Sequence, residues 1–119
     1  MSGRIVSEQE FRDALIFALE GVATPAFVTG PGRSGAIAAV YASHHLGVPF
    51  VPYTQRAAQH GALIVDTAMQ SGRTIRKASR LYGDAPFVVV FREPPRLRFW
   101  YEELSLTRGG GNEYRRVAA

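Results

Sequence analysis

The sequence predicts an α/β fold with a mainly parallel sheet. Apolar runs of four or five residues alternate with segments whose apolar residues recur at helical spacing, and glycine or proline separates most of these segments. Because helices connect the strands, right-handed crossovers would place the strands side by side in parallel. We therefore expect a three-layer domain in which the loops that follow the strands share one edge of the sheet.

Composition limits the classes of protein to consider. The 119 residues suffice for one domain, and 46% hydrophobic against 20% charged residues is typical of a globular chain. There is no cysteine, so disulfides and thiolate metal sites need no consideration. No apolar run approaches the roughly 20 residues of a membrane span or a signal-peptide core, and we expect a cytoplasmic protein. The net charge of +4 is compatible with a polyanionic small ligand, with nucleic acid, or with an ordinary basic surface.

The first predicted element is a helix over residues 7–20. Its apolar residues Phe11, Leu15 and Leu19 recur at helical spacing, and Ser7 with Glu10 forms a candidate capping box. Six further elements follow: a strand over 25–29, a helix over 36–46 ended by Gly47, strands over 48–53 and 62–66, a helix over 75–82 and a strand over 87–91.

The chain changes character after residue 91. Residues 92–95 break the pattern with two prolines, residues 97–106 are aromatic and expected to be extended, and a glycine run at 109–111 precedes a basic tail. The glycine run is compatible with a hairpin turn, a mobile loop or a disordered lead-in to the end. We expect one domain over 1–119, with a core over about 7–91 and a small C-terminal part over about 92–119.

The most informative stretch joins the strand at 62–66 to the following helix. The strand ends in the carboxylate of Asp66, and the polar turn after it contains Ser71, Gly72 and Thr74. A carboxylate at this place can accept hydrogen bonds from sugar hydroxyls, while hydroxyls and the backbone N–H groups that open a helix can hold a phosphate. The stretch therefore predicts a pocket for a phosphorylated sugar.

This stretch resembles the ribose-phosphate loop of type I phosphoribosyltransferases. In that family four apolar residues precede an acidic pair, three variable positions and Thr-Gly-x-Thr. The chain has Thr67 in place of the second acid and Ser71 in place of the first threonine, and residues 71–78 are closest to the pyrimidine attenuation regulator and uracil phosphoribosyltransferase branches. The resemblance covers about residues 25–91. The predicted ribose-phosphate loop consists of Asp66, Thr67, Ala68, Met69, Gln70, Ser71, Gly72, Arg73 and Thr74.

A second glycine-rich segment follows the strand at 25–29. It consists of Gly30, Pro31, Gly32, Arg33, Ser34 and Gly35. The segment satisfies the G-x-G-x-x-G pattern of dinucleotide-binding proteins, but no acidic residue between Gly35 and Asp66 is present to bind a ribose. The resemblance instead implies a pyrophosphate loop, in which backbone N–H groups and the Arg33 guanidinium bind phosphate oxygens. A tight strand-to-helix turn without a ligand is the structural alternative.

The resemblance also implies the chemistry. The substrates would be phosphoribosyl pyrophosphate and a nucleobase-like acceptor, with Mg²⁺ bridging substrate oxygens and Asp66 as catalytic carboxylate and metal ligand, directly or through water. Arg56 in the short loop at 54–61 is a possible pyrophosphate contact. The family's hood, the small subdomain that selects the base, would come from the N-terminal helix and the C-terminal part, with Phe99, Trp100 or Tyr101 stacking on the base.

Two functions remain open on these grounds. The first is a small phosphoribosyltransferase. The resemblance implies that it forms a homodimer, because members of the family commonly dimerise. The alternative is a noncatalytic module of the same fold that senses a nucleotide or phosphoribosyl pyrophosphate and binds RNA through its basic surface. The two phosphate loops favour the enzyme, whereas the single acid, the short loop at 54–61 and the minimal hood favour the sensor.

Overall fold

The computed structural model describes residues 5–54, 60–68, 72–92 and 97–102. In chain order its elements are β1 (Ile5–Val6), α1 (Glu8–Leu19), β2 (Phe27–Thr29), α2 (Gly32–Leu46), β3 (Ala62–Ala68), α3 (Arg73–Leu81), β4 (Phe87–Phe91) and β5 (Arg98–Phe99). None of the helices in these ranges is long and apolar enough to cross a membrane.

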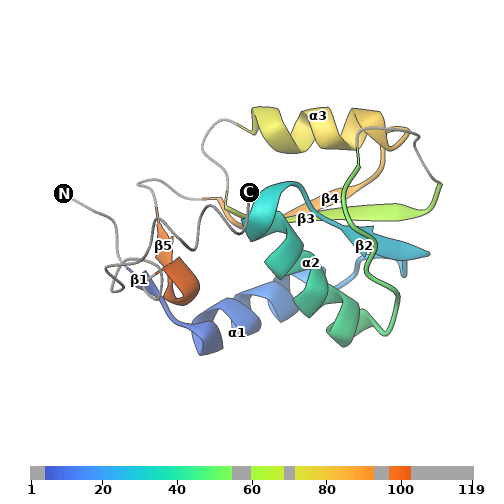
Figure 1. Cartoon of the computed structure of the whole chain (residues 1–119). Coiled ribbons are helices and arrows are strands. Elements are labelled where there is room, and N and C mark those ends of the chain that lie inside the picture. Colours follow the sequence, from blue (N-terminus) through green and yellow to red (C-terminus); the bar gives the residue numbers. More distant parts are fainter. Residues whose placement is uncertain (1–4, 55–59, 69–71, 93–96, 103–119) are drawn as a thin grey trace.

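A parallel sheet of β2, β3 and β4 forms the middle layer of the molecule. The strand order is β2-β3-β4, with Phe27 opposite Ala62 and Ile64 opposite Phe87. Helix α3 covers one face of the sheet, and α1 and α2 cover the other (Figure 1). The predicted three-layer α/β fold with a parallel sheet is therefore confirmed.

The side chains of β3 alternate between the two faces of the sheet. Leu63 and Val65 belong to the core cluster beneath α1 and α2, and Ile64 belongs to the cluster beneath α3. Helix α2 presents small buried residues to the sheet, so that its axis can approach the strands closely: Gly35, Ala38, Ala39 and Ala42. Burial on both faces explains why this strand is a continuous apolar run.

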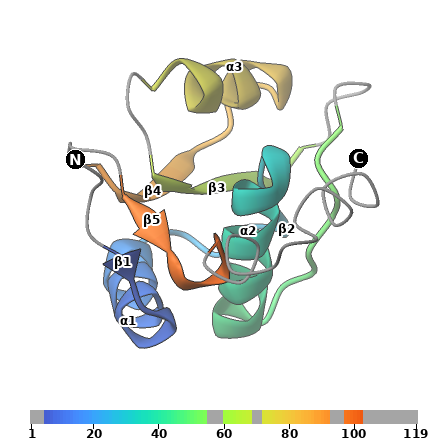
Figure 2. The ribbon, with the colours of Figure 1, turned by 60° about the vertical axis from the view of Figure 1, so that its left-hand side comes forward.

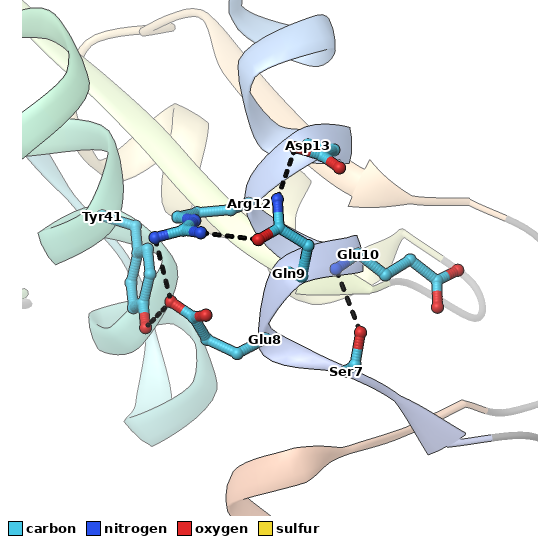
Figure 3. A network of polar contacts seen from close by, with 7 residues as sticks. All are labelled: Ser7, Glu8, Gln9, Glu10, Arg12, Asp13 and Tyr41. Carbon is cyan, nitrogen blue, oxygen red and sulfur yellow. Dashed lines mark hydrogen bonds and ion pairs between the residues drawn. The ribbon is translucent and has the colours of Figure 1, made fainter.

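Helix α1 begins at the predicted cap. The Ser7 Oγ accepts a hydrogen bond from the Glu10 N–H at 3.1 Å, which satisfies one of the free donors of the first turn (Figure 3). The Tyr41 hydroxyl of α2 donates to the Glu8 carboxylate at 3.1 Å in the same view, and Phe11 packs edge-on against the Tyr41 ring. These contacts attach α1 to α2 on the face opposite α3.

Two predicted boundaries shift in ways that affect the site. Strand β3 extends two residues beyond the prediction and includes Asp66, Thr67 and Ala68. Helix α2 begins at Gly32, four residues before the predicted start, so most of the predicted glycine-rich loop is its first turn. Helix α3 likewise begins at Arg73 rather than at residue 75. The loops at this edge are therefore shorter than the sequence predicts.

The predicted strand over 48–53 is wrong as a regular element. Only Phe50 forms a bridge, parallel to Val28 of β2, through hydrogen bonds from the Val28 N–H to the Pro49 carbonyl and from the Val51 N–H to the Val28 carbonyl. Pro49 and Pro52 have no N–H to donate, so a continuous ladder cannot form here.

A second, two-stranded sheet was not predicted. Strand β1 pairs in parallel with β5, with Val6 opposite Phe99. The predicted extended segment over 97–106 is correct only for Arg98 and Phe99 within the described residues, because residues 100–102 form a helical turn and residues 103–106 lie outside them. The described portion of the C-terminal part is thus tied to the N-terminus of the chain.

Candidate functional site

The candidate site lies at the carboxyl edge of the central sheet. Strands β2 and β3 are parallel neighbours, so the turns that lead into α2 and α3 begin at the same edge. Neither helix has a side-chain cap, because Pro31 and Gly72 occupy the N-cap positions, and neither has an acidic residue in its first turn. The N-termini of two adjacent helices, with the positive ends of their dipoles, therefore lie at this edge.

The turn between β2 and α2 is tight for a steric reason. A Cβ atom on Gly30 would collide with the carbonyl oxygens of Gly35 and Val65, and one on Gly35 would lie 2.8 Å from the Gly30 carbonyl carbon. The Gly35 N–H donates to the Pro31 carbonyl at 3.1 Å, which closes the first turn of α2. Close packing of strand and helix is thus sufficient to require glycine at both ends of the motif.

The middle of the motif, unlike its two ends, is exposed to solvent. Gly32 has a φ of 68°, and apart from its chain neighbours and the backbone of its own helix, no atom of the described residues lies within 4 Å of the place where its Cβ would be. The Arg33 side chain beside it is exposed, while Ser34 is half-buried. Gly32 and Arg33 are therefore the part of the turn that is open to an approaching anion.

Asp66 lies near the end of β3, where it pairs with Val89 of β4. Its side chain is partly buried, and burial raises the pKa of the carboxyl group to about 6. The Thr67 N–H donates a hydrogen bond to Asp66 Oδ1 at 2.8 Å, which acts against this rise in the pKa. The carboxylate is thus partly desolvated yet ionised above about pH 6.

Thr67 occupies the position of the missing second acid. It is only 3% exposed, and it belongs to the opposite face of β3 from Asp66 because successive side chains on a strand point to opposite faces. A carboxylate in this buried position would have to be desolvated. The neutral hydroxyl therefore suits the local packing.

The remaining loop residues divide into two groups. Gly72 is buried at the N-cap of α3 with a φ of 80°, and Arg73 and Thr74 are exposed in the first turn of that helix. Outside the described residues lie Arg56, Met69, Gln70 and Ser71, so their predicted roles stay predictions. Ala68 completes β3 and is partly buried.

The three C-terminal aromatics that could stack on a base differ in their surroundings. Phe99 is 3% exposed and packs against Phe11 and Phe91 in the core, which argues against a base contact for this residue. Trp100 is half-buried against the rings of Phe11 and Tyr41. Phe99 ends β5, whereas Trp100 and Tyr101 lie in the helical turn that follows it.

Tyr101 reaches the site by its hydroxyl. The Tyr101 hydroxyl and Ser34 Oγ are 2.8 Å apart, and either can donate. Both residues are candidates by sequence, but no sequence pattern indicates that they touch, because 67 positions separate them.

The sequence also contains no sign that Thr29 Oγ1, at the end of β2, is buried without a hydrogen-bond partner.

A metal at this edge would depend on its substrate. Within the described ranges, no three His, Asp or Glu side chains gather closely enough to hold a metal ion. Mg²⁺ commonly binds through one or two carboxylates together with substrate phosphates and water. The carboxylate of Asp66 fits that limited role, whereas a site built from protein ligands alone does not fit.

Comparison with known proteins connects this geometry to a fold. No protein-family model and no curated protein matches the sequence. A xanthine-guanine-hypoxanthine phosphoribosyltransferase from Helicobacter pylori superposes with a TM-score of 0.67 at 13% identity, covering 89% of this chain and 97% of that one. A purine phosphoribosyltransferase from Pyrococcus horikoshii gives 0.63 at 20% identity, covering 84% and 94%.

A third similar structure has a different description. It is a hypothetical protein from Neisseria gonorrhoeae with bound ppGpp, with a TM-score of 0.61 at 12% identity, covering 99% of this chain and 97% of that one. Together these structures show that the chain has the type I phosphoribosyltransferase fold. The likeness to the pyrimidine attenuation regulator and uracil branches stays a prediction.

Proposed function

We propose that the protein is a phosphoribosyltransferase that transfers the phosphoribosyl group of phosphoribosyl pyrophosphate to a nucleobase-like acceptor. The observation that carries this proposal is the pair of helix N-termini without side-chain caps, of α2 and α3, at the edge of the sheet near which Asp66 lies in β3. Two anion-binding helix ends with one carboxylate at the same edge suit a ligand with a phosphate at one end and a pyrophosphate at the other.

The reaction requires little covalent participation from the protein. A nitrogen of the acceptor forms a bond to the anomeric carbon while the bond from that carbon to pyrophosphate breaks, and pyrophosphate leaves with the electron pair. The acceptor's proton passes to solvent or to the leaving group. The turn at Gly32 would bind the pyrophosphate, the first turn of α3 would bind the 5'-phosphate, and Asp66 would accept hydrogen bonds from the ribose hydroxyls. Mg²⁺, when bound, neutralises charge on the pyrophosphate.

Pyrophosphate release is the direct test. We expect the protein to release pyrophosphate when it is mixed with Mg²⁺, phosphoribosyl pyrophosphate and at least one base from a purine and pyrimidine panel. Asp66→Asn removes the charge but keeps an oxygen that can accept from the Thr67 N–H, and it should lower kcat/KM by about 100-fold. Asp84→Asn is the matched control, because Asp84 is exposed at the turn that follows α3. Unchanged turnover and unchanged Mg²⁺-dependent binding in Asp66→Asn would remove Asp66 from the site.

The second candidate function is a noncatalytic nucleotide sensor. It is favoured by the buried Thr67 in place of a second acid and by the similar structure that binds ppGpp. Tight Mg²⁺-dependent binding of phosphoribosyl pyrophosphate or a guanosine polyphosphate, with no turnover of any base, would favour the sensor over the enzyme. For its RNA-binding form, we expect affinity to fall steeply with salt. Absence of RNA binding at low salt would contradict the hypothesis that the sensor binds RNA.

A further inference from the structure

The hydrogen bond between Tyr101 and Ser34 joins two distant segments at the site. Ser34 lies in the first turn of α2, whose N-terminus is the proposed anion-binding end. Tyr101 lies in the helical turn after β5, which Figure 2 shows beside α2. Within the described residues, this hydroxyl pair is a direct contact between the C-terminal part and the proposed phosphate-binding turn.

The Tyr101 ring is held in place by its own segment. It stacks on the Phe99 ring with centroids 5.7 Å apart and an interplanar angle of 9°, and it meets the Trp100 ring edge-on at 5.0 Å. The Glu102 carboxylate accepts a hydrogen bond from the Phe99 N–H at 2.8 Å, which closes the turn. These contacts fix the ring, and its hydroxyl is the group that meets Ser34 at the site.

The surroundings of the Tyr101 hydroxyl keep it protonated. Burial raises the pKa of this phenol, hydrogen bonding with the side chains of Ser34 and Thr67 acts against the rise, and the nearby charges of Glu102 and Asp66 add to it. The group is therefore a neutral hydroxyl at physiological pH, able to donate one hydrogen bond and accept others.

We propose that Tyr101 is a positioning residue whose hydroxyl holds the first turn of α2 against the C-terminal turn, which packs through Phe99 on Phe91 of β4. The position of the proposed pyrophosphate-binding turn then depends on the C-terminal part. The positioning follows from the contacts above, whereas the identity of the ligand rests on the proposed function. This role replaces the predicted stacking of Tyr101 on a base.

Hydrogen exchange of the unliganded protein tests the positioning. Tyr101→Phe removes only the hydroxyl, and we expect amide exchange in the peptide over residues 30–40 to accelerate by about threefold to tenfold, the range for one partly buried hydrogen bond. Tyr41→Phe is the matched control, since the Tyr41 hydroxyl contacts Glu8 of α1 instead (Figure 3), and exchange in this peptide should rise less. Wild-type exchange in Tyr101→Phe would overturn the inference.

Binding of Mg²⁺ and phosphoribosyl pyrophosphate tests the consequence. Calorimetry should show affinity reduced by about threefold to tenfold in Tyr101→Phe and in Ser34→Ala, with the double variant no weaker than either single variant, because both remove the same bond. Ser34→Thr keeps a hydroxyl and should restore affinity. In turnover assays the loss should appear in KM more than in kcat.

The outcomes separate this inference from the proposed function. Equal or tighter binding by Tyr101→Phe would overturn the positioning role, since the hydroxyl would then compete with the ligand for Ser34. Additive losses in the double variant would also overturn it. A wild-type protein that binds neither phosphoribosyl pyrophosphate nor inorganic pyrophosphate would overturn the proposed function, and the exchange measurement alone would then decide whether Tyr101 holds the turn.

Discussion

At the scale of single residues, burial determines how Asp66 titrates. The pKa of this carboxyl group rises from 3.8 to about 6 in the folded chain, so between these values the folded state binds more protons than the unfolded state. Stability therefore falls as pH rises from about 4 to about 6, and the full penalty for ionised Asp66 is present above that range.

Asp66→Asn should remove this penalty. We expect the variant to be more stable than wild type by about 1 to 3 kcal/mol at pH 7.5, and the difference to vanish below about pH 4, where both states of the wild type are protonated. Urea unfolding at the two pH values measures the effect, with Asp84→Asn as control. A variant that is no more stable at pH 7.5 would contradict the burial of this carboxylate.

The glycines at the start of α2 should differ in how much stability is lost when each is replaced by alanine. Gly30→Ala places a Cβ against the carbonyl oxygens of Gly35 and Val65, so we expect a loss of at least about 3 kcal/mol or failure to fold. Gly32→Ala meets no neighbour and has only the unfavourable φ of 68°, which should reduce stability by about 1 kcal/mol. Urea unfolding compares them, and equal losses would contradict the steric account.

At the scale of elements, the start of α1 rests on one side chain. Ser7→Ala deletes the hydroxyl that accepts from the Glu10 N–H, and it should reduce the free energy of unfolding by about 1 kcal/mol. Ser7→Thr keeps the acceptor and should lose less. Thermal unfolding of the two variants checks the cap, and equal destabilisation by alanine and threonine would show that the hydroxyl does not stabilise this end.

Element prediction succeeded where local pattern and packing agree. Strand β4 has the predicted bounds, Phe87–Phe91, because a run of five β-branched and aromatic residues favours a strand that is buried on both faces of a sheet. The start of α2 was missed because a glycine- and proline-rich segment is typical of a loop, whereas here helix packing against β3 extends the helix through it. Strand β1 was missed because Ile5 and Val6 are too few for a pattern.

At the scale of the whole molecule, the N-terminus supports the C-terminal part. Val6 is 0% exposed and faces the core, whereas Ile5, its neighbour in β1, is 49% exposed. Val6→Ala should reduce stability by about 2 kcal/mol and Ile5→Ala by less than about 0.5 kcal/mol, since only the first leaves a cavity. Chemical denaturation measures both, and equal effects would show that β1 does not pack as part of the folded unit.

The sequence by itself determined the α/β class, most of the helices and strands, and the likeness of residues 62–78 to a ribose-phosphate loop. These depend on local periodicity and on short motifs, which neighbouring residues carry. Only the tertiary structure decided that Phe99 belongs to the core, that Thr67 is buried, and that the Tyr101 hydroxyl meets Ser34. Those outcomes depend on packing between segments far apart in the chain, which no local pattern encodes.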